Sequence, residues 1–205
     1  MEIEEVVKEI KRSFRQVMDG AVAQSMRDKG VDYHLSWGVT LPRLHEMADD
    51  IKTTVPASSL YELAIALWKE NIRECKILAT MLMPHDIILP EVVDIWMEQT
   101  ETVEIAEQAA MNLYQHLPYA PMKAYEWIAS DKDLNQICGY HILSRLFLKG
   151  QEPNERGICE FLDQAHAALQ SSNLIVRKAA LNSLNHFSNL GLVYERLAGS
   201  VMRLV

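Results

Sequence analysis

Residues 60–82, LYELAIALWKENIRECKILATML, decide the fold class of this chain. Apolar residues recur three and four positions apart on both sides of a short polar break. This spacing puts the apolar side chains on one face of a helix, so the stretch predicts two short helices joined by a turn. A helix pair of this length is the usual unit of an α-helical repeat protein.

The same organisation recurs three more times, in Val92–Leu113, Ala124–Leu146 and Phe161–Leu184. The last leucines of the four stretches follow one another at steps of 31, 33 and 38 residues. A tryptophan falls late in the first helix of three of them: Trp68, Trp96 and Trp127. Helix pairs at such steps favour an α-solenoid of the HEAT or armadillo type. An irregular helical bundle with accidental spacing is the alternative.

We therefore predict an all-α, right-handed solenoid of about six HEAT-like helix pairs with few or no strands. One domain is expected over residues 1–205, because the chain is short for two. It divides into an N-terminal helix and loop (1–37), the repeats (38–190) and a C-terminal capping helix (191–205). Residues 2–27 read as one long amphipathic helix, and Thr40 with Pro42 predicts the start of the next.

Composition is that of a globular protein, with 49% apolar and 23% charged residues. No stretch approaches 18 uninterrupted apolar residues, and the acidic start does not resemble a signal peptide. The three cysteines, Cys75, Cys138 and Cys159, are odd in number and never spaced as CxxC. These features predict a cytoplasmic protein with reduced thiols that has no contact with a membrane.

Charge argues against a strong nucleic-acid binder. Lys and Arg number 20 against 28 Asp and Glu, a net charge of -8. There is no Lys or Arg between Lys76 and Lys123, a stretch that contains seven carboxylates. Because phosphate neutralisation supplies most of the affinity for nucleic acid, this middle region would repel DNA. Cations gather nearer the two ends of the chain: Lys8, Lys11, Arg12, Arg15, Arg177, Lys178, Arg196 and Arg203.

Several motifs resemble the AlkD-type DNA alkylation repair proteins, a family of HEAT-like solenoids. LAIALW at 63–68 and IRECKILA at 72–79 are similar to the family signature, in which an LALxLW helix precedes an xhEaxxLA helix. VRKA at 176–179 matches the family's IRKA, and Gly38-Val39 with Pro42, Leu44 and Ala48 looks like its opening helix. The resemblance covers Gly38 to about Phe187.

Active members of that family release cationic alkylated bases from DNA, using an Asp, two tryptophans and an Arg. The family's WDTVD turn falls on residues 100–104, where Glu104 replaces the catalytic Asp and Thr100 replaces the first Trp. The Arg falls on the run 136–139, QICG, which contains no cation, and the later Trp becomes Asn182. The resemblance therefore implies a family member that has lost most of the family's chemistry.

Three other groups of polar residues could have a function, but a structural role explains each of them more simply. The carboxylates of Glu91, Asp94, Glu98, Glu101 and Glu104 recur at helical spacing, which suits either a cation site or, more simply, a solvated helix face. Asp163 and His166 could form half a metal site or one hydrogen bond. Cys138 could be a nucleophile beside His141, although a buried structural thiol is the simpler reading.

Two further segments leave alternatives open. The stretch Asp32–Gly38, rich in polar aromatic residues including Trp37, either binds a ligand or packs one end of the solenoid. The apolar last helix either docks as a cap or forms a dimer surface.

We expect a non-catalytic AlkD-like protein that uses its concave face to bind another protein or, weakly, duplex DNA. It would act as a monomer or homodimer, without metal or cofactor. Its binding residues would be Thr100, Glu101, Arg177, Lys178, Asn182 and Trp37. The alternative is an alkylpurine DNA glycosylase in which Glu104 is catalytic. A homo-oligomeric scaffold held through the last helix is a third reading.

Overall fold

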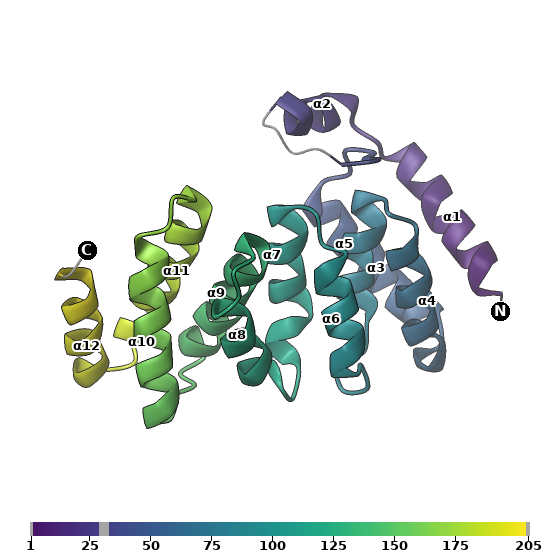
Figure 1. Ribbon diagram of the computed structural model, residues 1–205. Helices are drawn as coiled ribbons and strands as arrows, with labels where there is room; N and C mark the ends of the chain where they lie inside the picture. The colour runs from purple at the N-terminus through teal and green to yellow at the C-terminus, as the bar shows by residue number, and fades with distance from the viewer. Residues whose placement is uncertain (1, 29–32, 204–205) are drawn as a thin grey trace. The chain divides into compact units, whose positions relative to one another are not determined.

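The computed structural model describes residues 2–28 and 33–203, and all regular structure in these ranges is helical (Figure 1). No helix there is long and apolar enough to cross a membrane. The helices of the described part are α1 (Ile3–Gln16), α2 (Gly20–Asp28), α3 (Leu41–Thr54), α4 (Ala57–Lys69), α5 (Arg73–Leu82), α6 (Pro90–Glu98), α7 (Val103–Asn112), the 3-10 helix η1 (Tyr114–His116), α8 (Ala120–Ile128), α9 (Asp133–Leu148), α10 (Glu155–Leu169), α11 (Leu174–Ser188) and α12 (Leu192–Arg203).

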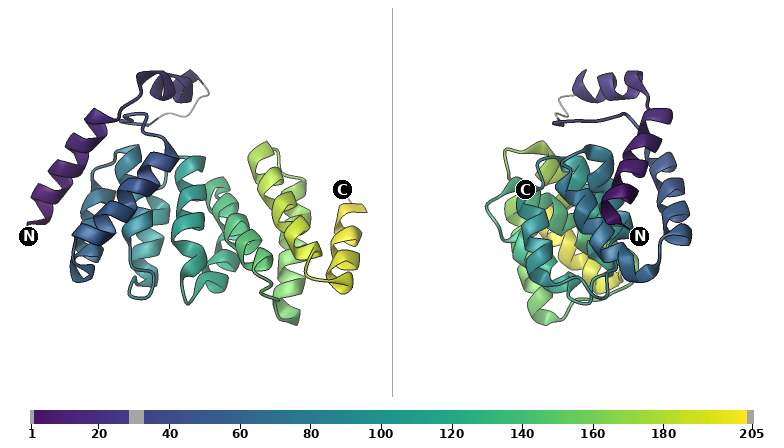
Figure 2. Two further views of the ribbon diagram at one scale, coloured as in Figure 1. Left: turned by 180° about the vertical axis from the view of Figure 1, so that it is seen from behind. Right: turned by 90° about the vertical axis from the view of Figure 1, so that its right-hand side faces the viewer.

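The chain forms two compact units, Met1–Asp94 and Ile95–Val205. In the first unit α5 is the central helix, because it packs against α3 and α4 and every one of its residues is buried. Helix α1 packs against α4 through Val7, Ile10 and Phe14. Helix α2 stands at the margin of this unit, as two views show (Figure 2).

The expectation of one helix over residues 2–27 is wrong, because the chain breaks between α1 and α2. Asp19 causes the break. Its carboxylate accepts hydrogen bonds from the backbone N–H groups of Ala21 (2.9 Å) and Val22 (3.1 Å), which caps a new helix at Gly20. A short acidic side chain that bonds the following backbone favours a helix start over helix continuation. The predicted start at Leu41 is confirmed, with Pro42 in the first turn of α3.

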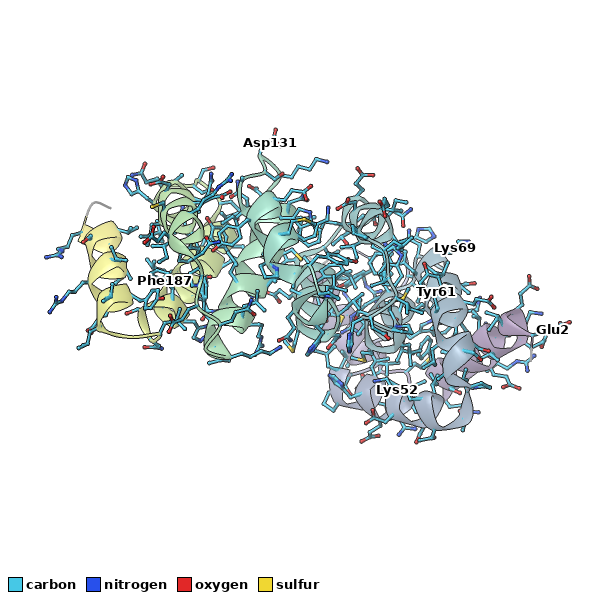
Figure 3. All side chains as sticks on the ribbon, turned by 90° about the horizontal axis from the view of Figure 1, so that it is seen from below. Glu2, Lys52, Tyr61, Lys69, Asp131 and Phe187 are labelled. Carbon is cyan, nitrogen blue, oxygen red and sulfur yellow. The ribbon has the colours of Figure 1, made fainter. Side chains whose placement is uncertain are left out.

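The second unit is built around α9, which packs against α7, α8 and α11. Helix α10 packs against α8 and α11, and α12 packs against both α10 and α11. The rings of Phe147, Phe161 and Phe187 lie 5.0–5.4 Å apart between centroids and form an aromatic core. Phe187 is among the side chains labelled in Figure 3. Ala198 and Val201 of α12 are buried, while Leu192 and Val193 are exposed; Leu204 and Val205 lie outside the described residues.

The predicted helix pairs are confirmed. The four repeated stretches coincide with α4 and α5, α6 and α7, α8 and α9, and α10 and α11. Trp68, Trp96 and Trp127 each lie late in the first helix of a pair, and each is at least 97% buried. The repeated tryptophan is therefore a buried core residue in three of the repeats.

Candidate nucleic-acid interface

Three second helices of the pairs, α7, α9 and α11, lie next to one another in the second unit, with α9 in the middle. Polar side chains project from them at spacings of three and four residues, so each set shares one side of its helix. We call this set the second-helix face. Its residues are Glu104, Glu107, His141, Arg145, Lys178, Asn182 and His186.

Two groups of contacts join the three helices across this face. His141 Nε2 lies 3.3 Å from Glu107 Oε1, which connects α9 to α7. Asn182 donates a hydrogen bond to Ser144 Oγ (3.0 Å), and Ser144 Oγ lies 2.6 Å from His186 Nδ1, which connects α9 to α11. Sequence reasoning missed these two histidine contacts, because they join residues 34 and 42 positions apart.

Glu104, the predicted catalytic residue, lies in the first turn of α7 and is partly exposed. Thr102 caps this helix, accepting a hydrogen bond from the Ile105 N–H (3.3 Å). A carboxylate in the first turn is stabilised by the helix dipole, so Glu104 has a structural role whether or not it has a catalytic one.

Thr100 is buried and Glu101 is exposed, both in the connection between α6 and α7. The Thr100 hydroxyl donates to the Trp96 carbonyl (2.8 Å), so it is occupied within its own chain segment. The carboxylates from Glu91 to Glu104 do not share one helix face, because α6 ends at Glu98 and α7 starts at Val103. The two threonines, Thr100 and Thr102, terminate one helix and begin the next.

In the run 136–139 of α9, where the resemblance placed the family's Arg, Gln136 is partly exposed and donates to the Ser130 carbonyl (2.6 Å), whereas residues 137–139 are buried. Cys138 contacts the Ala106 carbonyl of α7 (3.5 Å from its sulfur). Gly139 lies so close to α8 that an added Cβ would be 2.8 Å from the Ala124 carbonyl oxygen. The partly exposed cation of α9 is instead Arg145, six residues further on. Its place one turn after His141 is the sequence signal for it.

Arg177 and Lys178 lie in the first turns of α11. Arg177 donates to the Ser171 carbonyl and is partly buried, whereas Lys178 is exposed. Asn182, one turn after Lys178, is exposed and bonded to Ser144. Of the predicted binding residues, Lys178 and Asn182 therefore share the second-helix face with Glu104.

Trp37 belongs to the first unit, in the loop before α3. Glu74 holds this loop, accepting hydrogen bonds from the Ser36 hydroxyl (3.1 Å) and from the backbone N–H groups of Trp37 (3.1 Å) and Val39 (3.2 Å). The Trp37 ring is partly exposed and lies 5.4 Å from the Arg15 guanidinium carbon. Asp32, at the start of the predicted loop, lies outside the described residues.

Arg73 completes the support of this loop. Its guanidinium donates to the Val39 carbonyl (2.8 Å) and to Glu74 (3.2 Å), and both charged side chains are buried. Gly38 has a φ of +73°, and an added Cβ would lie 2.1 Å from the Asp19 carbonyl oxygen. Only glycine fits there. The Arg-Glu pair of the sequence signature thus fixes the path of the chain around Trp37.

The other sequence candidates are structural. Burial raises the pKa of Cys138 above its ordinary range and that of Cys75 to about 12, so neither thiol is activated. His141 contacts Glu107 and not Cys138, and His166 contacts Gln170 and not Asp163. Over residues 2–28 and 33–203, no three His, Cys, Asp or Glu side chains gather where they could hold a metal ion.

The family model described as DNA alkylation repair enzyme matches residues 10–190. The chain belongs to this family. A solved structure adds the fold: it superposes with a TM-score of 0.81 at 16% identity and covers 96% of this chain and 81% of its own. It is described as a new family of proteins related to the HEAT-like repeat DNA glycosylases with affinity for branched DNA structures. No curated protein matches the chain.

The DNA alkylation repair family and the HEAT-like repeat fold predicted from the sequence are thereby confirmed. Family membership does not by itself assign base excision to this chain, since its site residues differ from those that the resemblance implies.

Proposed function

We propose that this chain is a DNA-binding member of the DNA alkylation repair family that does not excise bases. The observation that supports this is the chemistry of the second-helix face, whose residues include no Phe, Tyr or Trp. The aromatic residues of α7, α9 and α11 are Tyr140, Phe147 and Phe187, and all three are at least 96% buried. A face without an exposed Phe, Tyr or Trp ring lacks the ring faces that attract a cationic alkylated base.

The charges of the face favour DNA contact at its α9 and α11 side. Arg145 and Lys178 are the cations there, whereas α7 presents Glu104 and Glu107. With few cations and a net charge of -8, affinity for a linear duplex would be low. A branched DNA presents more than one duplex arm to the same surface, and a solved structure that shares the fold is described as a family with affinity for branched DNA structures. We infer that branched DNA is the preferred ligand.

Fluorescence anisotropy tests this with a labelled four-way junction and a linear duplex of the same sequence, at low and physiological salt. Tighter binding to the junction, weakened by salt, is the expected result. A base-release assay on methylated DNA is run alongside with the wild type and with Glu104→Gln, and no release is expected from either.

Two results would overturn the proposal. Release of methylated purine by the wild type and not by Glu104→Gln would assign the glycosylase activity to Glu104. Failure to bind either DNA at low salt would show that this face does not bind DNA, and a protein partner would then be sought for it.

A further inference from the structure

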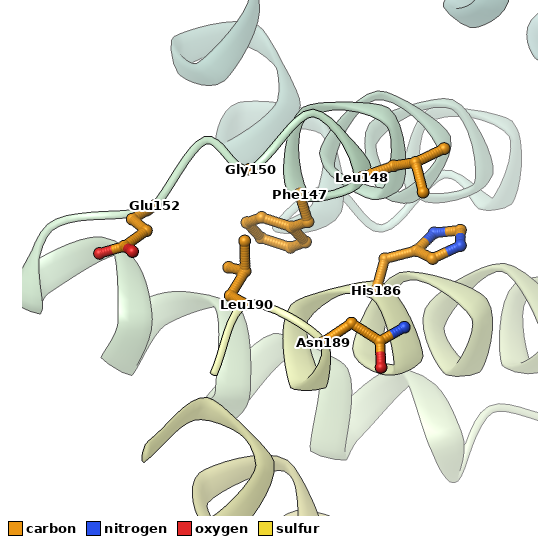
Figure 4. Close-up of a pocket in the computed structure, with 7 residues that line it drawn as sticks. All are labelled: Phe147, Leu148, Gly150, Glu152, His186, Asn189 and Leu190. Atoms are coloured by element: carbon orange, nitrogen blue, oxygen red, sulfur yellow. The ribbon is translucent and has the colours of Figure 1, made fainter. Parts of the chain in front are cut away.

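A pocket of about 310 Å³ lies at the ends of α9 and α11 in the second unit (Figure 4). Phe147, Leu148 and Leu190 supply its apolar walls, and His186, Asn189 and Glu152 supply its polar groups. It continues the second-helix face, because His186 belongs to both and Leu148 lies one turn after Arg145. Its volume is at the lower end of the range of about 300–1,000 Å³ for ligand sites, which suits a small planar group.

Hydrogen bonds from Asn182 to Ser144 and between Ser144 and His186 bear on which ring nitrogen of His186 can donate to a ligand. The Asn182 amide donates to Ser144 Oγ, so the Ser144 hydroxyl proton is available for His186 Nδ1, 2.6 Å away. When the Ser144 hydroxyl donates to Nδ1, the proton of the neutral imidazole is on Nε2. In that tautomer, Ser144 and Asn182 hold the ring and Nε2–H is the donor that remains for a ligand.

Asn189 offers a second polar group. It is the C-cap residue of α11, it is exposed, and within the described residues its side-chain amide has no hydrogen-bond partner. The amide therefore has a donor and an acceptor free on one edge of the pocket. Figure 4 shows the Asn189 and His186 side chains on neighbouring turns of α11.

We propose that this pocket receives an unpaired base of the bound DNA, with adenine preferred. The inference rests on the proposed DNA-binding function and adds a site to it. Unstacked bases are recognised by contact with apolar or aromatic side chains and by hydrogen bonds to their edges. An asparagine amide pairs with the N6 and N7 edge of adenine through two hydrogen bonds.

The charges around the pocket favour a base over a phosphate inside it. Glu152 is on the pocket wall, where the Tyr194 hydroxyl donates to its carboxylate (2.9 Å), and a carboxylate repels a phosphate. Lys149 and Arg145 lie beside the pocket in sequence and are not among its lining residues. They suit the phosphates on either side of an inserted base.

Three forked duplexes test the proposal. They are identical except at one unpaired position next to the branch, which carries adenine, thymine or an abasic-site analogue. Anisotropy titrations with the full chain should give binding about tenfold tighter for adenine than for the abasic probe, the size expected of a bidentate base contact. Asn189→Ala should remove this preference. Asn185→Ala, an exposed asparagine one turn earlier on α11 and outside the pocket, should keep it.

The outcomes separate this site from the general function. Equal affinity for the three probes, or a preference that survives Asn189→Ala, overturns the pocket while DNA binding stands. No binding of any probe at low salt overturns the proposed function, and this inference with it.

Discussion

Glu74 belongs to the family signature, and its role in this protein is to hold a loop in place by hydrogen bonds. It is fully buried, pairs with the buried Arg73, and accepts hydrogen bonds from Ser36, Trp37 and Val39. A buried carboxylate is costly to desolvate unless such partners surround it. The sequence identified Glu74 only as part of a motif. Its partners come from a loop 35–38 residues earlier in the chain, so only the tertiary structure assigned its role.

Replacing Glu74 by Ala should lower the free energy of unfolding by about 3–5 kcal/mol, because a buried ion pair with Arg73 and the hydrogen bonds to Ser36, Trp37 and Val39 are lost together. Urea unfolding measures the change. Glu62→Ala, an exposed carboxylate on α4, is the matched control and should alter stability by less than about 0.5 kcal/mol. A loss below about 1 kcal/mol at Glu74 would contradict the role given to the pair.

At the scale of elements, α9 determines how the second unit packs. It contacts α7, α8 and α11, and Gly139 permits its close approach to α8. An added Cβ at Gly139 would lie 2.8 Å from both the Ala124 carbonyl oxygen and Ile128 Cγ2. The helix itself was predicted from its apolar spacing. The sequence did not show which of its residues faces α8, because α7 and α11 pack against other sides of the same helix.

Gly139→Ala should destabilise the protein by about 1–3 kcal/mol through overpacking, which outweighs the gain of about 1 kcal/mol from helix propensity. Gly199→Ala in α12 is the matched control, since nothing lies within 4 Å of its added Cβ. That change should stabilise the protein by about 0.5–1 kcal/mol. Urea unfolding of both variants gives the comparison, and stabilisation by Gly139→Ala would refute the close contact.

At the scale of the whole molecule, DNA binding depends more on where the charges lie than on the net charge. The chain carries -8 overall, but the second-helix face combines the carboxylates of α7 with cations on α9 and α11. Acidic residues elsewhere act over distances comparable to the Debye length, about 8–10 Å, and are largely screened at physiological salt. A few placed cations can therefore hold a DNA backbone on an acidic protein.

The salt dependence of junction binding should report those cations. Arg145→Ala and Lys178→Ala should each reduce the slope of log K against log salt by about 1, the value for one lost phosphate contact. Lys52→Ala, an exposed lysine on α3 outside the proposed interface, should leave the slope unchanged (Figure 3). Anisotropy titrations over a range of salt give the slopes, and equal slopes for all variants would place the phosphate contacts elsewhere.

The sequence alone determined the helical class, the positions of the paired helices and the family. Apolar periodicity and repeat spacing are local properties of the chain, so the sequence displays them directly. The tertiary structure alone decided which polar residues meet. Asp19 divided a predicted helix by bonding the backbone next to it, and Cys138 and Gly139 are buried in the run on which the resemblance places the family's Arg. Neighbouring helices supply the partners of His141, His186 and Asn182. Such contacts depend on how the helices pack and in which register, and the sequence of one protein does not specify either.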